Sequence, residues 1–262
     1  MLKQILNRVQ TAVADACCSL CGGPVVDSGY STCRLCHQRL GFRLNSAPLP
    51  PVLPSTQPSA INCHAVTLFN NRIRQLIYSY KFHHQRSHQP ALVDLLFRYL
   101  CQWQPDWMPL ATPGGKVWLV TIPPHEAHGP PALMQPIAVS LAQRLQTWLS
   151  ASAAREPGGT SLFRPAGQGL FQAGESTLLC WQRSVQRQHH LHTRQERLEN
   201  MRDSLLCEPS AHFSPDDTVL LLDDLMTTGA TLNAAAQAIR QSGFKGAMAA
   251  LVLCHVPMNH SR

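Results

Sequence analysis

The chain has 262 residues, of which 44% are hydrophobic and 14% charged, and its formal net charge is +7. This length and hydrophobicity allow one medium-sized core with a small appendage, and they exclude global disorder. The positive charge comes mainly from arginine, whose planar guanidinium suits phosphate groups. It is therefore compatible with a nucleic acid or a phosphorylated small molecule as partner.

The first residues and the apolar segments do not resemble membrane anchors. The longest apolar stretch, Ala247–Cys254, is far shorter than the ~20 residues that span a bilayer. Residues 1–13 lack the continuous apolar core of a signal peptide and instead space their apolar residues as a short amphipathic helix does. We expect no membrane insertion and a cytoplasmic location.

Two C-x-x-C pairs stand near the start of the chain, Cys18–Cys21 and Cys33–Cys36, with eleven residues between them. Four thiolates at this spacing complete the tetrahedral shell of a structural Zn²⁺. Disulfides are the alternative, which a cytosolic chain disfavours. Cys17 is a spare neighbour, and the remaining cysteines are expected to be small buried hydrophobes. Residues 1–45 are thus predicted to form a zinc module, either a clamp on the following domain or a platform for a partner.

A proline-rich, uncharged linker is predicted at residues 46–60, and the main domain at residues 61–262. Within it, apolar periodicity predicts alternating strands and helices. The glycines and prolines of residues 150–176 predict a loop or a weakly ordered insertion there. The expected strands are Asn62–Phe69, Val117–Ile122, Leu178–Trp181, Val219–Leu222 and Ala249–Val256, and the expected helices are Ile73–Tyr80, Pro90–Trp103, Pro136–Leu149 and Leu232–Gln241. This alternation is typical of an α/β fold, a mostly parallel sheet with helices on both faces.

The segment Val219–Leu232 predicts a phosphate site. Its all-apolar strand belongs at the centre of the sheet and is expected to end at two carboxylates, Asp223 and Asp224. A Thr-Thr-Gly-Ala-Thr run then opens a helix, whose first amides and dipole attract an anion. Gly229 lets the backbone approach that anion. The two carboxylates suit a phosphorylated sugar, since they can accept hydrogen bonds from its hydroxyls or lie near Mg²⁺.

The motif LLLDDLMTTGAT resembles the phosphoribosyl-pyrophosphate (PRPP) signature of type I phosphoribosyltransferases. With the cysteine pairs ahead of it, the chain is similar to the ComF family, also called GntX-like or amidophosphoribosyltransferase-like competence proteins. Arg74–Phe82, Ile122–Pro124 and Arg183–Asn200 support this more loosely. The resemblance covers nearly the whole chain and implies a type I phosphoribosyltransferase-like fold.

The resemblance also implies site residues. Asp223 and Asp224 would meet the ribose hydroxyls, and Mg²⁺ would accompany PRPP. The 5-phosphate would be held by Thr227, Thr228, Gly229, Ala230 and Thr231. Lys81 is placed near the pyrophosphate as the candidate catalytic residue, a solvated lysine being the alternative. Burial of the two carboxylates in ion pairs would count against this interpretation.

The implied role is the uptake or use of exogenous DNA, in natural transformation or as a nutrient. Its partners would be single-stranded DNA and other DNA-uptake proteins. Candidates for the nucleic-acid contact are Arg183, Arg187, Arg194 and Arg197.

The chain departs from the family in two places. His128–Gln135 stands where members carry Arg-Gly-Phe-Asn-Gln, and Thr227 stands where purine-salvage relatives have an aspartate base. Both changes remove groups that transfer chemistry uses. Whether the chain is an enzyme therefore stays open. The alternatives are an active phosphoribosyltransferase of unknown acceptor and a structural scaffold with a vestigial phosphate site.

Overall fold

The computed structural model describes residues 17–25, 31–40, 61–83, 85–102, 115–124, 133–155, 171–174, 178–182, 194–208 and 213–256. The elements of the amino-terminal half are α2 (Arg34–Arg39), β1 (Asn62–Leu68), α3 (Asn71–Phe82), the 3₁₀ turn η1 (Arg86–His88), α4 (Gln89–Gln102), β2 (Val117–Thr121) and α6 (Met134–Arg155). Those that follow are β3 (Phe171–Ala173), β4 (Leu179–Trp181), α7 (Arg194–Met201), β5 (Leu205–Cys207), β6 (Thr218–Met226), α8 (Ala230–Gln241) and β7 (Ala247–His255).

Five strands form one parallel sheet in the order β1-β7-β6-β2-β3. β6 occupies the central position, as its apolar run Val219–Leu222 predicts, and its residues from Thr218 to Leu222 are all buried. β4 and β5 form a separate antiparallel pair. The predicted α/β class with a parallel sheet is therefore confirmed.

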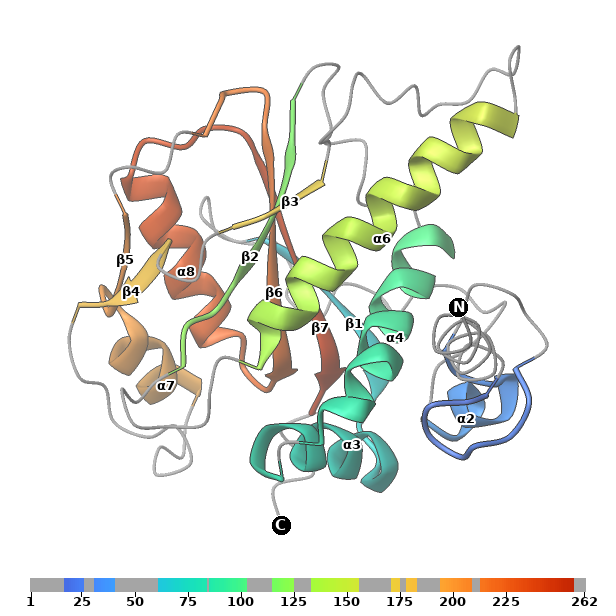
Figure 1. Cartoon of the computed structure of the whole chain (residues 1–262). Coiled ribbons are helices and arrows are strands. Elements are labelled where there is room, and N and C mark those ends of the chain that lie inside the picture. The colour runs from blue at the N-terminus through green and yellow to red at the C-terminus, as the bar shows by residue number, and fades with distance from the viewer. Residues whose placement is uncertain are drawn as a thin grey trace.

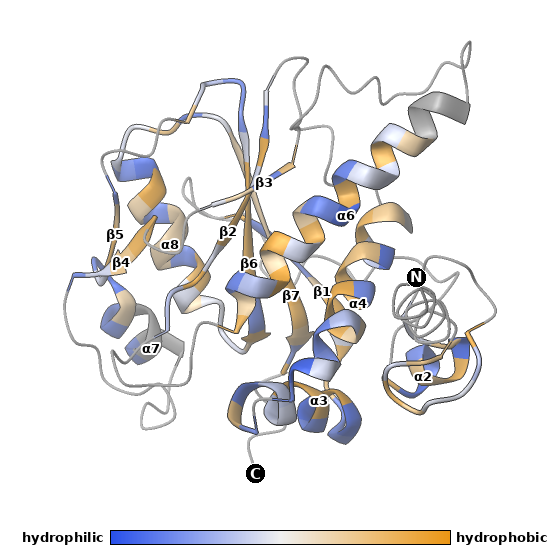
Figure 2. Ribbon diagram, in the orientation of Figure 1, coloured by the Kyte–Doolittle hydropathy of each residue, from blue (hydrophilic) through white to orange (hydrophobic). Residues whose placement is uncertain are grey.

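Helices cover both faces of this sheet (Figure 1). Leu220 and Leu222 of β6 share one core with α3, α4 and α6. Val219 and Leu221 point to the other face, where they share a core with α8 and with Met201 at the end of α7. This division follows from the strand period of two. Figure 2 shows the same arrangement, with apolar residues along the strands and hydrophilic residues gathered on outer surfaces such as that of α3.

The structure corrects two of the predicted boundaries. The loop predicted at residues 150–176 is wrong in part, because α6 continues to Arg155 and β3 pairs with β2. The central strand was predicted to end at Leu222, whereas β6 runs to Met226 and pairs with β7 along its length. Backbone pairing with a long neighbour extends the strand through its polar residues, which the apolar pattern alone does not show.

Several predicted features lie outside the described residues: the helix in residues 1–13, the linker at 46–60 and most of the 150–176 segment. None of the described helices combines the length and the apolar character needed to cross a bilayer.

Candidate functional site

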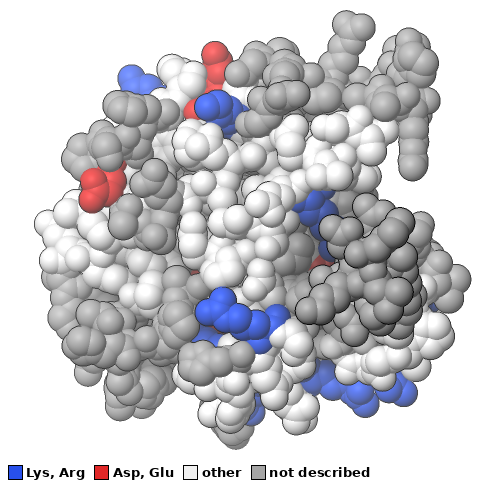
Figure 3. Space-filling model, in the orientation of Figure 1, with Lys and Arg blue, Asp and Glu red and all other residues white. Residues whose placement is uncertain are grey.

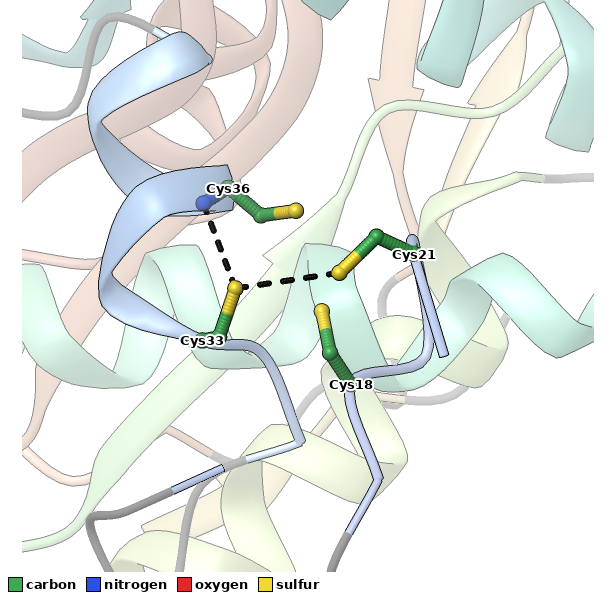
Figure 4. Close-up of side chains that lie close together, drawn as sticks. All are labelled: Cys18, Cys21, Cys33 and Cys36. Carbon is green, nitrogen blue, oxygen red and sulfur yellow. Dashed lines mark hydrogen bonds between the residues drawn. The ribbon is translucent and has the colours of Figure 1, made fainter. Parts of the chain in front are cut away.

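The four predicted cysteines lie together at a turn and the start of α2 (Figure 4). All four sulfur atoms lie within 4.8 Å of one another, and Cys21 Sγ is 3.8 Å from Cys33 Sγ. A tetrahedral Zn²⁺ with bonds of ~2.3 Å separates its sulfur ligands by about 3.8 Å, so the donor set fits this metal. The cysteines are free thiols, which excludes the disulfide alternative in this structure. Cys17 is exposed and lies outside the cluster.

The turn between Cys18 and Gly23 supports the cluster through its backbone. Gly22 has a φ of 71°, and the amide of Gly23 donates to Cys21 Sγ at 3.4 Å. Burial acts to raise the pKa of Cys18, but hydrogen bonds from the amides of Cys33, Leu20 and Cys21 lower it to about 7. Amides aimed at sulfur stabilise the thiolate form, which is the form that binds metal.

The cysteine module is attached to the main domain through the carboxylate of Asp94 on α4. Asp94 Oδ2 accepts hydrogen bonds from Ser31 N at 2.6 Å, Ser31 Oγ at 2.9 Å and Thr32 Oγ1 at 2.9 Å. Its other oxygen pairs with Arg144 of α6. Asp94 is fully buried. Of the two roles considered for the module, these contacts match a clamp on the following domain.

The second site lies where the strand order of the sheet reverses. The connection through α6 carries the chain from β2 outward to β3 on one side, and the connection through α8 carries it from β6 outward to β7 on the other. The carboxyl ends of β2 and β6 therefore flank a topological switch point, where open α/β sheets bind ligands. The side chain of Gln135 links the ends of β2 and β3 at this edge. Its oxygen accepts a hydrogen bond from Thr121 Oγ1 and its amide group donates one to the carbonyl of Gly174, both at 2.8 Å.

The two predicted carboxylates lie in β6 at this edge and face different sides of the sheet. Asp224 follows Leu222 onto the side of α3, where Lys81 Nζ lies 3.1 Å from its Oδ2. Asp223 follows Leu221 onto the side of Cys63. Burial and the charge of Asp224 raise the pKa of Asp223 well above its usual range. Such a carboxyl group holds its charge at an energetic cost, which is typical of functional sites.

Asp224 thus forms the kind of buried ion pair that counts against a carboxylate awaiting sugar hydroxyls. Its side chain is 11% exposed and that of Lys81 is 33% exposed. For Asp223, the described residues show a hydrogen bond from the amide of Asp224 at 2.8 Å and no ion pair. The structure thus places Lys81 beside the acidic pair, where its ammonium group is the ion-pair partner of Asp224.

The loop after β6 adopts the geometry that its threonines and glycine predict. Gly229 has a φ of 74° and immediately precedes the first turn of α8. Thr228 Oγ1 accepts from the amide of Ala230 at 3.3 Å. Thr227 and Thr231 are half-buried beside it. The predicted phosphate loop therefore starts a helix at the carboxyl end of the central strand, with its glycine in the left-handed region that other residues adopt only with strain.

His255 is a residue of this edge that sequence reasoning missed. It ends β7 opposite Met226, and its ring forms a hydrogen bond with the backbone of Thr227. Burial lowers the pKa of His255, and that hydrogen bond opposes the shift. A polar residue at the end of an apolar strand was the available signal, because neighbouring parallel strands end at the same edge.

Buried sulfur lies beneath the same edge. The thiol of Cys63 on β1 donates to Met226 Sδ at 3.4 Å. Burial, together with the charge of Asp224, raises the pKa of Cys254 to about 11. Both thiols are fully buried, as predicted for the cysteines outside the N-terminal cluster, whereas Cys180 is exposed and Cys101 half-buried, which corrects the prediction for these two.

The arginines predicted to contact nucleic acid are only partly placed. Arg194 and Arg197 belong to α7, and Arg183 and Arg187 lie outside the described residues.

No protein-family model matches the chain, and no curated protein is significantly similar to it.

Proposed function

We propose that the chain is a PRPP-binding, phosphoribosyltransferase-like protein of the ComF type that acts in the uptake or use of exogenous DNA and binds single-stranded DNA. The observation that carries the proposal is Gly229 in a left-handed conformation before α8, in the loop that follows the strand with the acidic pair. It stands at the switch point of the sheet. The motif resemblance supplies the ligand and the cellular role.

The residues of this edge can be matched to the parts of PRPP. The amides at the start of α8 and the loop Thr227–Thr231 would take the 5-phosphate. Asp223 would accept hydrogen bonds from ribose hydroxyls, and Mg²⁺ would accompany the pyrophosphate. When PRPP binds, the ammonium group of Lys81 would leave Asp224 and pair with the pyrophosphate oxygens. Asp224 could then accept a hydrogen bond from a ribose hydroxyl. The 33% exposure of the Lys81 side chain favours this exchange, because part of it already faces water.

Calorimetric titration with PRPP and Mg²⁺ tests the proposal. Asp223→Asn removes the charge that the ribose hydroxyls would meet, and we expect at least a tenfold loss of affinity, since a hydrogen bond to a charged group contributes about 1.5–3 kcal/mol. Asp216→Asn is the matched control, because Asp216 is exposed and precedes β6 at the opposite edge of the sheet. If the wild-type protein takes up no PRPP, the scaffold alternative holds.

Catalysis is tested separately from binding. Pyrophosphate release from PRPP would be measured across a panel of nucleobases and amines. Binding without release supports a ligand-binding role, and release with one acceptor establishes the transferase alternative. Association with labelled single-stranded DNA, measured at several salt concentrations, tests the DNA part.

A further inference from the structure

Two aromatic side chains lie exposed on α3. Tyr78 is 51% and Phe82 48% exposed, although burial of aromatic surface is normally favourable. The residues are four apart, so both rings lie on one side of the helix, with centroids 4.6 Å apart and planes inclined by 40°. His83 adds a third ring, 5.5 Å from that of Tyr78. The three rings form an aromatic cluster in which about half of the surface of Tyr78 and of Phe82 is open to solvent.

Positive charge surrounds this aromatic cluster. Residues 71–88 contain Arg72, Arg74, Lys81 and Arg86 and no aspartate or glutamate. The three arginines are exposed. Figure 3 shows lysine and arginine side chains gathered along the lower part of this face, in the region of α3, and acidic side chains mainly towards its upper and left margins. An anionic partner is therefore favoured at α3.

The aromatic cluster adjoins the PRPP site proposed above. Arg74, Tyr78 and Lys81 follow the spacing i, i+4, i+7 and so share one side of α3. Lys81 at the end of this row contacts Asp224 of β6. A ligand stacked on Tyr78 would thus lie near the carboxyl edge of the sheet.

We propose that this surface of α3 binds a single strand of nucleic acid, with bases stacked on Tyr78 and Phe82 and phosphates held by Arg74 and Arg86. Flat aromatic bases match exposed rings, and a phosphate backbone matches the surrounding arginines. A duplex hides its base faces within its own stack and does not fit this surface. The inference rests on the nucleic-acid part of the proposed function and places that contact on α3 rather than on the Arg183–Arg197 segment.

Fluorescence anisotropy with a labelled 20-nucleotide oligothymidylate tests the proposal on the full-length protein. Tyr78→Ala and Phe82→Ala should each weaken binding by about 5- to 150-fold, the loss typical of one stacked base. Tyr78→Phe keeps the ring and should stay within about threefold of wild type. Arg74→Gln and Arg86→Gln should each reduce the slope of log K against log salt by about 0.7.

The controls separate this surface from other sites. Leu206→Ala changes an apolar residue of similar exposure, 42%, on β5, and Arg183→Gln with Arg187→Gln changes the other candidate segment. Both should bind as wild type does. Because alanine favours helix, the ring variants should retain the wild-type circular dichroism spectrum and melting temperature. The same titration with an oligouridylate and with a DNA duplex compares RNA and paired DNA with the oligothymidylate, and the duplex should bind most weakly.

Three outcomes would overturn the inference. If the ring variants bind the oligonucleotide as tightly as wild type while the variant at Arg183 and Arg187 does not bind it, nucleic acid binds elsewhere and the proposed function stands. If wild type binds no single strand, this inference and the DNA role both fall, and PRPP calorimetry still decides the sugar-phosphate site. If sedimentation shows a dimer that Tyr78→Ala with Phe82→Ala abolishes, the surface joins two copies of the chain instead.

Discussion

Asp94→Ala removes the carboxylate that joins the cysteine module to the main domain. Three hydrogen bonds from Ser31 and Thr32 lose their acceptor, and the ion pair between Asp94 and Arg144 is broken. Because Asp94 is fully buried, water cannot replace it without opening the contact between the module and α4.

Breaking a buried ion pair by removing one partner destabilises a protein by about 3–5 kcal/mol. The Arg144 side chain is 23% exposed and regains some hydration, so we expect the lower end, about 3 kcal/mol. Ser31→Ala removes one hydroxyl and leaves the amide of Ser31 in place, so it should cost about 1 kcal/mol. The ratio between these two variants tests whether the carboxylate organises the whole contact.

Urea unfolding measures both changes, and Asp94→Ala should lower the midpoint by about 1–3 M at the usual denaturant sensitivities. Release of Zn²⁺ to a chromogenic chelator should accelerate as well, because Ser31 and Thr32 directly precede Cys33. A double-mutant cycle that combines Asp94→Ala with Arg144→Met should give an interaction energy of about 1–3 kcal/mol between the two side chains. Unchanged unfolding and unchanged metal release in Asp94→Ala would refute this account of the clamp.

Three further predictions concern the two sites. Lys81→Met leaves Asp224 without its partner and should lower stability by about 1 kcal/mol and weaken PRPP binding, measured by thermal unfolding and calorimetry. Burial raises the pKa of Asp223 well above its usual value of 3.8, so its stabilising contribution is complete below that pH and is lost as the pH rises through the folded-state pKa. Asp223→Asn should therefore gain stability relative to wild type as the pH rises above the usual aspartate pKa of 3.8, and a difference that stays constant with pH would contradict the raised pKa of Asp223. Cys33→Ser should abolish Zn²⁺ retention in metal analysis, whereas Cys17→Ser should retain the metal, because Cys17 lies outside the cluster.

Local patterns in the sequence were enough for the α/β class, the central place of β6 and the four cysteines. An all-apolar strand can be buried only with neighbours on both sides, so its composition already places β6. The two C-x-x-C pairs each fix a local turn, and a tetrahedral metal site needs only two such turns facing each other. Gly229 was likewise predictable, because few residues tolerate the conformation that precedes α8.

Features that depend on partners distant in the chain were not predictable. The strand carrying Asp223 and Asp224 extends through both residues because β7 pairs with it, and the strand period then sends their side chains to opposite faces. Lys81 meets Asp224 across 143 residues, and His255 reaches Thr227 only because β6 and β7 end together.

The sequence by itself determined which residues could carry chemistry: cysteines at metal spacing, an acidic pair on a buried strand, and a glycine before a helix. These are local properties, set by side-chain type and backbone preference. Only the tertiary structure decided which groups neutralise one another and which stay exposed. The pairing of Lys81 with Asp224, the burial of Asp94 and the exposure of Tyr78 all follow from how the helices pack on the sheet, since charge and burial depend on every neighbour in space.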